Sequence, residues 1–277
     1  MLRNTFVLPA SIAVLLSGAQ AATFYAIGPD PNTFVPDQLV AISVSPPSLS
    51  TIATLGDGSL GFSGGLTFGP GASLYAIAND SAGASSFYTV QPDATLSLVG
   101  AAGGLGFGFN GGLAYDPVNS TFYAAVNDVS GNSSLYSITG GGIAGATGWN
   151  LGTGFSGLAF DAADNLFYGI GNDSTGFSTL YDFSLGGPVT SVAGLGFGFG
   201  ALTYDGAAHV LWAIDPVNNA GSQLFQISTA GTMSPSFTVG DGFAGLAAPQ
   251  PAQTPEPAGG VGAGLLLIAS ALKRRKL

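Results

Sequence analysis

The chain has 277 residues, of which only 7% are charged, with 5 Lys or Arg against 15 Asp or Glu. The stretch from Ala22 to Thr254 contains no Lys or Arg, and because Glu256 lies outside it, this body holds 14 Asp and one His. Its formal charge of −14 repels phosphate groups and excludes nucleic acid as a partner. Cys is absent, so packing and backbone hydrogen bonds must stabilise the fold.

The first 21 residues have the pattern of a secretory signal peptide. A single cation, Arg3, precedes an apolar stretch from Thr5 to Leu16. Ala19-Gln20-Ala21 then forms a small-residue site for signal peptidase. We predict that residues 1–21 are removed and that the mature chain begins at Ala22. A retained N-terminal anchor is the alternative, which the short apolar stretch disfavours.

The body is an internal repeat with three clear landmarks. The first is a Gly-Phe turn into a strand, whose Phe residues lie 47, 46, 44 and 44 residues apart, at Phe62, Phe109, Phe155, Phe199 and Phe243. The second is an aromatic strand at 24–27, 74–77, 122–125, 167–170 and 211–214. The third is a further strand at 38–42, 86–90, 134–138, 179–183 and 223–227. A weaker fourth strand is predicted at 49–55, 95–99 and 190–193.

Four short strands in each repeat of about 45 residues are typical of a β-propeller blade. We therefore predict an all-β fold, a five-bladed β-propeller of four-stranded blades over residues 22–249. The repeats begin with the second landmark at Phe24 and end with the first at Leu246. N-terminal and C-terminal strands should thus complete one blade and close the ring. A linear solenoid with polar caps is the alternative.

Small residues recur where the inner strands of a narrow ring would crowd together, at Gly65, Gly112, Gly157, Ala201 and Gly245. The Phe of each Gly-Phe turn is expected to pack between blades. We favour this role in the core over a platform on which sugars stack.

Acidic residues also recur with the repeat. Asp116, Asp161 and Asp205 follow the first strand of a repeat. Asp80, Asp128 and Asp173 follow the second strand, with Asp30 and Asp215 in the same phase. Oxygen ligands on one rim would suit calcium, but Asp also bonds its own backbone in turns. We favour turns and predict no metal site and no cofactor, with weak calcium binding as the alternative.

Catalytic constellations are mostly missing from the body. It has no Cys, Lys or Glu, and its one His, His209, lies in a turn before a strand. We therefore predict no catalytic residues and no enzyme activity. A polysaccharide hydrolase or lyase would have to use Asp residues that converge on the propeller axis.

The tail has three consecutive parts. Pro255-Glu256-Pro257 is followed by a charge-free stretch over residues 258–272 and by Lys273, Arg274, Arg275 and Lys276. Fifteen helical residues rise about 22 Å, short of a full membrane span. The basic cluster can extend that span and would remain cytoplasmic. We expect a linker at 250–257 and a transmembrane helix with a basic tail at 258–277.

This tail resembles the PEP-CTERM sorting signal of Gram-negative bacteria. The resemblance covers the tail alone and implies recognition by an exosortase, a membrane-embedded cysteine protease of the transpeptidase kind. It implies transient membrane anchoring, cleavage near the PEP motif and delivery to the cell surface or extracellular matrix. An anchor that is never cleaved is the alternative.

Together these patterns indicate an exported, exosortase-processed protein with a structural or binding role in an exopolysaccharide or biofilm matrix. Its partners would be signal peptidase, exosortase, the membrane through residues 258–272, and extracellular polysaccharide. Two alternatives remain, a polysaccharide-acting hydrolase or lyase and a calcium-binding adhesin.

Overall fold

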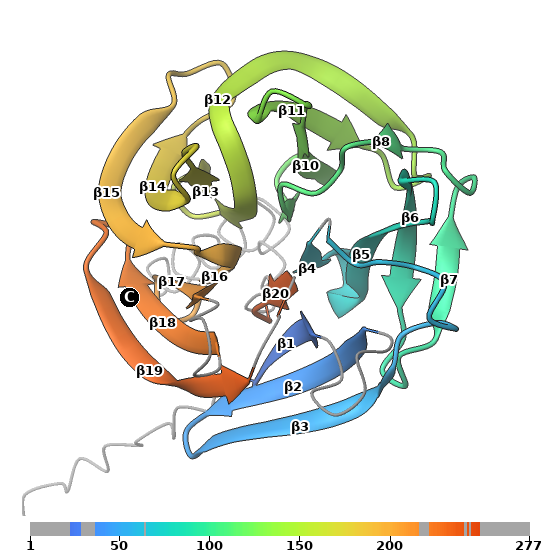
Figure 1. Cartoon of the computed structure of the whole chain (residues 1–277), viewed down its shortest axis with the longest axis horizontal. Coiled ribbons are helices and arrows are strands. Elements are labelled where there is room, and N and C mark those ends of the chain that lie inside the picture. The colour runs from blue at the N-terminus through green and yellow to red at the C-terminus, as the bar shows by residue number, and fades with distance from the viewer. Residues whose placement is uncertain are drawn as a thin grey trace, which may run out of the picture.

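The computed structural model describes residues 23–28, 37–63, 65–215, 222–240, 243 and 245–249. Within these ranges the chain is all-β, as predicted, and the single helical element is a 3-10 turn at Pro70–Ala72 (Figure 1). None of the described segments forms a helix that is long and apolar enough to cross a membrane. The predicted signal peptide, linker and membrane helix lie outside the described residues.

The strands pair antiparallel into four-stranded units, each named here after its second strand. The β1 unit contains β20 (Gly245–Ala247), β1 (Thr23–Gly28), β2 (Gln38–Val44) and β3 (Pro47–Thr54). The β5 unit contains β4 (Leu66–Phe68), β5 (Leu74–Asn79), β6 (Ala84–Val90) and β7 (Leu96–Val99), and β8 (Gly106–Phe107) pairs with the start of β6.

One long strand, β12 (Ala144–Asp161), belongs to two units. Its first part completes the β10 unit with β9 (Leu113–Asp116), β10 (Thr121–Asn127) and β11 (Asn132–Ile138). Its second part begins the β13 unit with β13 (Leu166–Asn172), β14 (Phe177–Phe183) and β15 (Thr190–Phe197). The β17 unit contains β16 (Gly200–Asp205), β17 (Val210–Asp215), β18 (Ser222–Ser228) and β19 (Met233–Gly240).

The units stand around a common centre, with the first strand of each innermost and the fourth outermost (Figure 1). The inner strands contact one another in the order β20, β4, β9, β12, β16 and β20 again. Strands β20 and β1 share one sheet although they come from opposite ends of the described chain, with Tyr25 opposite Ala247.

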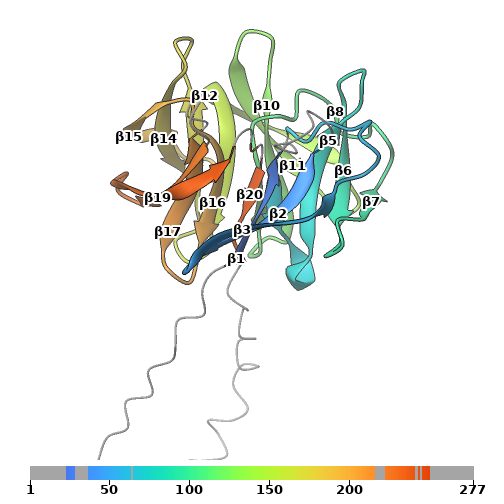
Figure 2. The same cartoon turned by 60° about the horizontal axis from the view of Figure 1, so that its bottom comes forward.

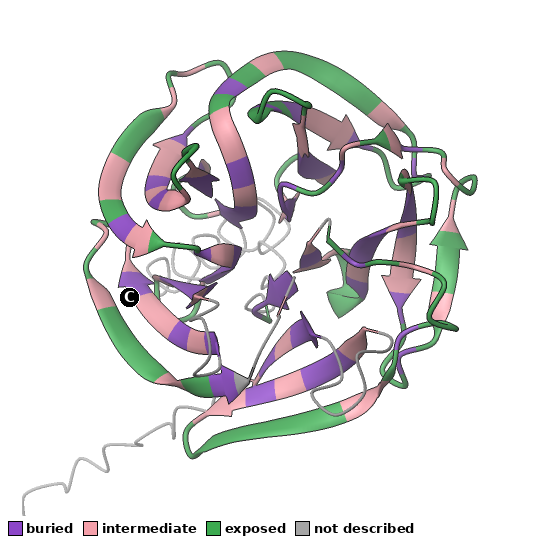
Figure 3. Ribbon diagram, in the orientation of Figure 1, coloured by how far each residue is buried: buried purple, intermediate pink, exposed green. Residues whose placement is uncertain are grey.

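The hydrophobic core lies between the units. Phe24 and Ile42 of the β1 unit pack with Trp212 and Ile214 of the β17 unit in one cluster. Four of the five Gly-Phe landmark residues, Phe62, Phe109, Phe155 and Phe199, are buried, and Phe243 is partly buried against the same core, which confirms their predicted role. Figure 3 shows burial concentrated on the inner strands, while the outer strands are largely exposed. Burying such side chains stabilises the fold by about 1.5–3 kcal/mol each.

Both described ends of the body lie at the same edge. Because β1 starts beside the end of β20 and runs antiparallel to it, Thr23 and Pro249 leave from one rim. We call this the termini rim; it also carries the turns between the first and second strands of the other four units. The opposite far rim carries the turns between the second and third strands of the β5, β10 and β13 units. Figure 2 shows the units from the side, with the start of β1 at the lower edge.

Candidate functional site

The predicted processing residues lie outside the described part of the chain. These are Ala19, Ala21, Pro255, Glu256, Pro257, Lys273, Arg274, Arg275 and Lys276. The candidate functional surface of the described body is therefore formed by its two rims, its centre and the clefts between units.

The acidic residues of the termini rim hold tight turns. Asp116 Oδ1 accepts hydrogen bonds from the backbone amides of Val118 at 2.8 Å and Asn119 at 3.1 Å. Asp161 and Asp205 accept equivalent bonds from amides two and three residues further on. All three carboxylates are buried. Each therefore holds its own turn through Oδ1, while Oδ2 of Asp161 is buried without a hydrogen-bond partner among the described residues.

The acidic residues of the far rim share one arrangement, in which each carboxylate accepts hydrogen bonds from two backbone amides of its own hairpin. Asp128 Oδ1 accepts from the amides of Ser130 at 2.8 Å and Asn132 at 2.9 Å. Asp80 and Asp173 repeat this arrangement. The bond from the Asn132 amide, with smaller contributions from its neighbours, lowers the pKa of Asp128. Bonds from Thr175, its hydroxyl first, lower the pKa of Asp173.

These turns account for the periodicity of the Asp residues. The hydrogen bonds are those of Asx turns, in which the carboxylate satisfies the backbone of its own hairpin. Within the described ranges, no three His, Asp or Glu side chains come close enough together to hold a metal ion.

The centre of the molecule is filled by backbone. A Cβ atom placed on Gly65 would lie 2.6 Å from the nitrogen of Leu113, and one on Gly112 would lie 2.4 Å from the nitrogen of Leu158. A cavity of about 10 Å³ remains there, lined by Gly, Ala, Leu and Ser residues, which is room for about one water molecule. The prediction that the small residues allow close approach of the inner strands is confirmed. The described residues lining this centre include no carboxylate.

Adjacent units are joined on the far rim by a side-chain arrangement that we call the clasp. Between the β10 and β13 units, the Phe155 amide donates to Ser133 Oγ at 2.7 Å, and Asn127 Nδ2 donates to the Phe155 carbonyl at 2.9 Å. The Ser133 hydroxyl donates in turn to Asn127 Oδ1. The clasp thus satisfies both backbone groups of a buried Phe.

The same clasp joins the β13 and β17 units through Asn172, Ser178 and Phe199. The Phe199 amide donates to Ser178 Oγ at 2.9 Å, and Asn172 Nδ2 donates to the Phe199 carbonyl at 3.3 Å. These Asn and Ser residues were not predicted from the sequence. Their constant separation of six residues, at Asn127 and Ser133 and at Asn172 and Ser178, is the pattern that could have revealed them.

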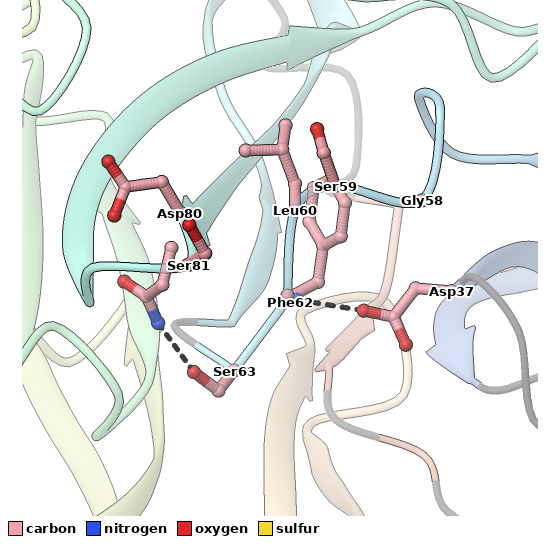
Figure 4. Close-up of a pocket in the computed structure, with 10 residues that line it drawn as sticks. Asp37, Gly58, Ser59, Leu60, Phe62, Ser63, Asp80 and Ser81 are labelled. Carbon is pink, nitrogen blue, oxygen red and sulfur yellow. Dashed lines mark hydrogen bonds between the residues drawn. The ribbon is translucent and has the colours of Figure 1, made fainter.

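An aspartate takes the acceptor role between the β1 and β5 units. The Phe62 amide donates to Asp37 Oδ2 at 2.8 Å (Figure 4). Burial raises the pKa of Asp37, although the bond from Phe62 opposes this shift. Asp37 lines a cleft of about 530 Å³ with Ser59, Ser63, Asp80 and Ser81.

A larger cleft of about 660 Å³ lies on the far rim between the β10 and β13 units. Its polar lining consists of Asn110, Asn127, Asn132, Asn172, Ser130, Ser156, Ser174, Thr153 and one carboxylate, that of Asp173. Amides and hydroxyls both donate and accept hydrogen bonds without carrying charge. Such a lining matches the hydroxyl groups of sugars.

The single histidine occupies an exposed turn of the termini rim, as predicted. The ring nitrogen Nδ1 of His209 lies 3.1 Å from the hydroxyl of Tyr204. Burial, followed by the nearby carboxylate of Asp161, raises the pKa of Tyr204. The contact between the His209 imidazole and the Tyr204 hydroxyl therefore holds the turn.

No family model matches the chain, and no curated protein matches it. The structure is similar to that of TolB from Acinetobacter baumannii, with a TM-score of 0.51 and 12% identity over 77% of this chain and 52% of that chain. It is also similar to a chain of a nidogen/laminin complex, with a TM-score of 0.52 and 14% identity over 83% of this chain and 98% of that chain. This chain spans about half the length of the TolB chain it matches. At these identities the likeness concerns the fold alone, and it shows that the body is a β-propeller.

Proposed function

We propose that the chain is an exported, non-catalytic protein of the cell surface or extracellular matrix that binds extracellular polysaccharide. The observation that carries this proposal is the contrast between the centre and the clefts. The centre is packed with backbone and lined by no described carboxylate. The cleft between the β10 and β13 units is lined mainly by uncharged amides and hydroxyls.

This contrast disfavours the hydrolase or lyase alternative. Glycoside hydrolysis needs two carboxyl groups that flank one bond. Among the described residues, the buried carboxylates of the termini rim are bound to their own turns, in separate units. These hydrogen bonds stabilise the turns, and the carboxylates do not converge on a shared substrate site.

We propose further that the five units are the blades of a closed ring. The cyclic order of contacts between the inner strands and the pairing of β1 with β20 support this arrangement. Both described ends then leave from the termini rim. A tail anchored through residues 258–272 would attach the body by that rim and turn the far rim outward.

Sorting by the tail is tested by changing Pro255, Glu256 and Pro257 to Ala in an exosortase-positive Gram-negative host. The full-length variant should accumulate in the membrane fraction, whereas the wild-type chain should be cleaved and found with the surface or matrix. Equal release of a product of the same mass from both chains would contradict exosortase sorting.

Binding is tested by co-sedimentation of the mature wild-type chain with the host's exopolysaccharide, assayed in parallel for release of reducing ends. Binding without turnover is expected. Turnover that a single Asp→Asn change abolishes in a folded variant would favour the hydrolase or lyase alternative. Binding that requires micromolar calcium and resists salt would favour the calcium-binding adhesin.

A further inference from the structure

A groove with an aromatic wall lies between the β10 and β13 units, toward the termini rim. Its volume is about 530 Å³, and its lining includes Tyr123, Ser137, Thr147, Trp149 and Leu185. It is separate from the amide-lined cleft of the far rim. None of the described residues that line it carries a charge.

Trp149 breaks the repeat at this groove. It lies on β12 opposite Leu135 of β11. At the same register position, the other units carry Ala53, Val99, Ala193 and Phe237. A smaller side chain therefore suffices at this position in most units, whereas Trp149 packs one part of its indole against the core cluster that contains Phe183 and leaves another part exposed.

The backbone beside Trp149 also departs from the repeat. Tyr136 pairs with Ala146 and Leu135 pairs with Trp149, so Thr147 and Gly148 form a bulge of two residues. At the corresponding position, the other units have one unpaired residue or none. The Thr147 hydroxyl donates to the Leu135 carbonyl at 2.6 Å and fixes the bulge. Bulges commonly re-aim a side chain next to a site.

The chemistry of the groove suits an uncharged sugar ring. Trp149 is partly exposed and lies in a T-shaped arrangement with Phe183, with ring centroids 6.0 Å apart. An indole offers a flat apolar surface on which the C–H face of a sugar can lie. The hydroxyls of Ser137 and Thr147 donate to backbone carbonyls, and Thr147 Oγ1 also accepts from the Trp149 amide at 3.3 Å. Each hydroxyl oxygen therefore retains a lone pair that can accept from a sugar hydroxyl.

The negative charge of the body favours uncharged polysaccharides over anionic ones. It carries 14 Asp residues and no Lys or Arg, so an anionic polymer is repelled at moderate salt. An uncharged polymer meets no such barrier.

We propose that this groove binds an uncharged sugar residue of a polysaccharide, with Trp149 stacked on its C–H face and Ser137 and Thr147 accepting from its hydroxyls. This inference rests on the proposed polysaccharide-binding function and assigns it to a particular site.

The test compares the wild-type chain with Trp149→Ala and with Phe237→Ala, which changes the same register position in the β17 unit. Calorimetry measures binding of a panel of uncharged oligosaccharides, including cellohexaose and maltohexaose, and of anionic polygalacturonate. Trp149→Ala should weaken binding of an uncharged oligosaccharide by at least about tenfold, while Phe237→Ala leaves it unchanged. Polygalacturonate should not bind.

Tryptophan fluorescence gives a second readout. The chain contains two Trp residues, and Trp212 is only 6% exposed, so a saturable emission change on binding reports on Trp149. If Trp149→Ala does not fold, Ser137→Ala is used, which should weaken binding and leave the emission of the free protein unchanged.

The outcomes separate the two proposals. Wild-type affinity in folded Trp149→Ala would overturn the groove assignment and leave the polysaccharide-binding function standing. Failure of the wild-type chain to bind any uncharged glycan, or binding of polygalacturonate alone at this groove, would overturn the inference. If the wild-type chain bound neither these oligosaccharides nor the host's exopolysaccharide, the proposed function would be overturned as well.

Discussion

The hydroxyl of Ser133 accepts a hydrogen bond from the backbone amide of Phe155 at 2.7 Å, across the boundary between two units. Phe155 is 1% exposed and Ser133 is fully buried, so water cannot replace this acceptor. The bond therefore couples the packing of an aromatic core residue to the register of a neighbouring unit.

We expect Ser133→Ala to lower the free energy of unfolding by about 1–3 kcal/mol, because it leaves a buried donor without a partner. Denaturant titration measures this loss. Ser130→Ala, at an exposed position of the preceding hairpin, should change stability by less than about 0.5 kcal/mol. Equal stability of the two variants would show that the clasp contributes nothing to the cohesion of the units.

Asp37 should make stability depend on pH in a direction unusual for a carboxylate. Burial raises its pKa above the ordinary value of 3.8, so the folded state binds a proton more readily than the unfolded state. Its contribution to the free energy of unfolding is therefore greatest below 3.8 and declines as pH rises through the folded pKa. We expect Asp37→Asn, which keeps an acceptor for Phe62, to gain stability relative to wild type between about pH 3.5 and about pH 7.

Asp93→Asn provides the matched control for this titration. Bonds from Thr95, the backbone amide first, lower the pKa of the exposed Asp93. Its stabilising contribution is present at neutral pH and is lost as pH falls through the folded pKa. The stability difference from wild type should therefore change with pH in the opposite sense. Denaturant titrations that give both variants the same trend would contradict the burial of Asp37.

The repeat was readable from the sequence because each unit repeats the same chemistry. The second and third strands were predicted within about two residues, since their aromatic and aliphatic residues face a core between units. Gly112 and its equivalents could be assigned to the inner strands because only small residues fit where these strands approach one another closely. The turn function of Asp128 followed from a rule that is local to the hairpin.

Long-range features were less accessible. The predicted strand at 190–193 extends to Phe197, and the fourth strands at Ala144–Thr153 and β19 were expected from the four-stranded blades but not located in the sequence. These outer strands carry Gly and small polar residues because they are largely solvated, and such residues indicate turns as readily as strands. The Trp149 groove depends on contact between the β10 and β13 units, which no local pattern reveals.

Gly112 should tolerate no side chain. Its φ of +108° is unfavourable for L-residues, and a Cβ atom would lie 2.4 Å from the nitrogen of Leu158. We expect Gly112→Ala to destabilise the fold by at least about 3 kcal/mol. Gly140→Ala is the control, because no atom lies within 4 Å of its Cβ position. A similar melting temperature for both variants would contradict the close packing of the centre.

Removal of β20 should open the proposed ring. Leu246 is 1% exposed and packs in one cluster with Phe24 and Trp212. A chain that ends after Asp241 loses this side chain, worth about 1.5–3 kcal/mol, and leaves the inner edge of β1 unpaired. A chain that ends after Pro249 also lacks the tail but retains β20. We expect the shorter chain to melt at a lower temperature or to aggregate through its exposed edge, as followed by thermal denaturation and light scattering. Equal melting temperatures for the two truncated chains would refute closure of the ring by strands from opposite ends of the chain.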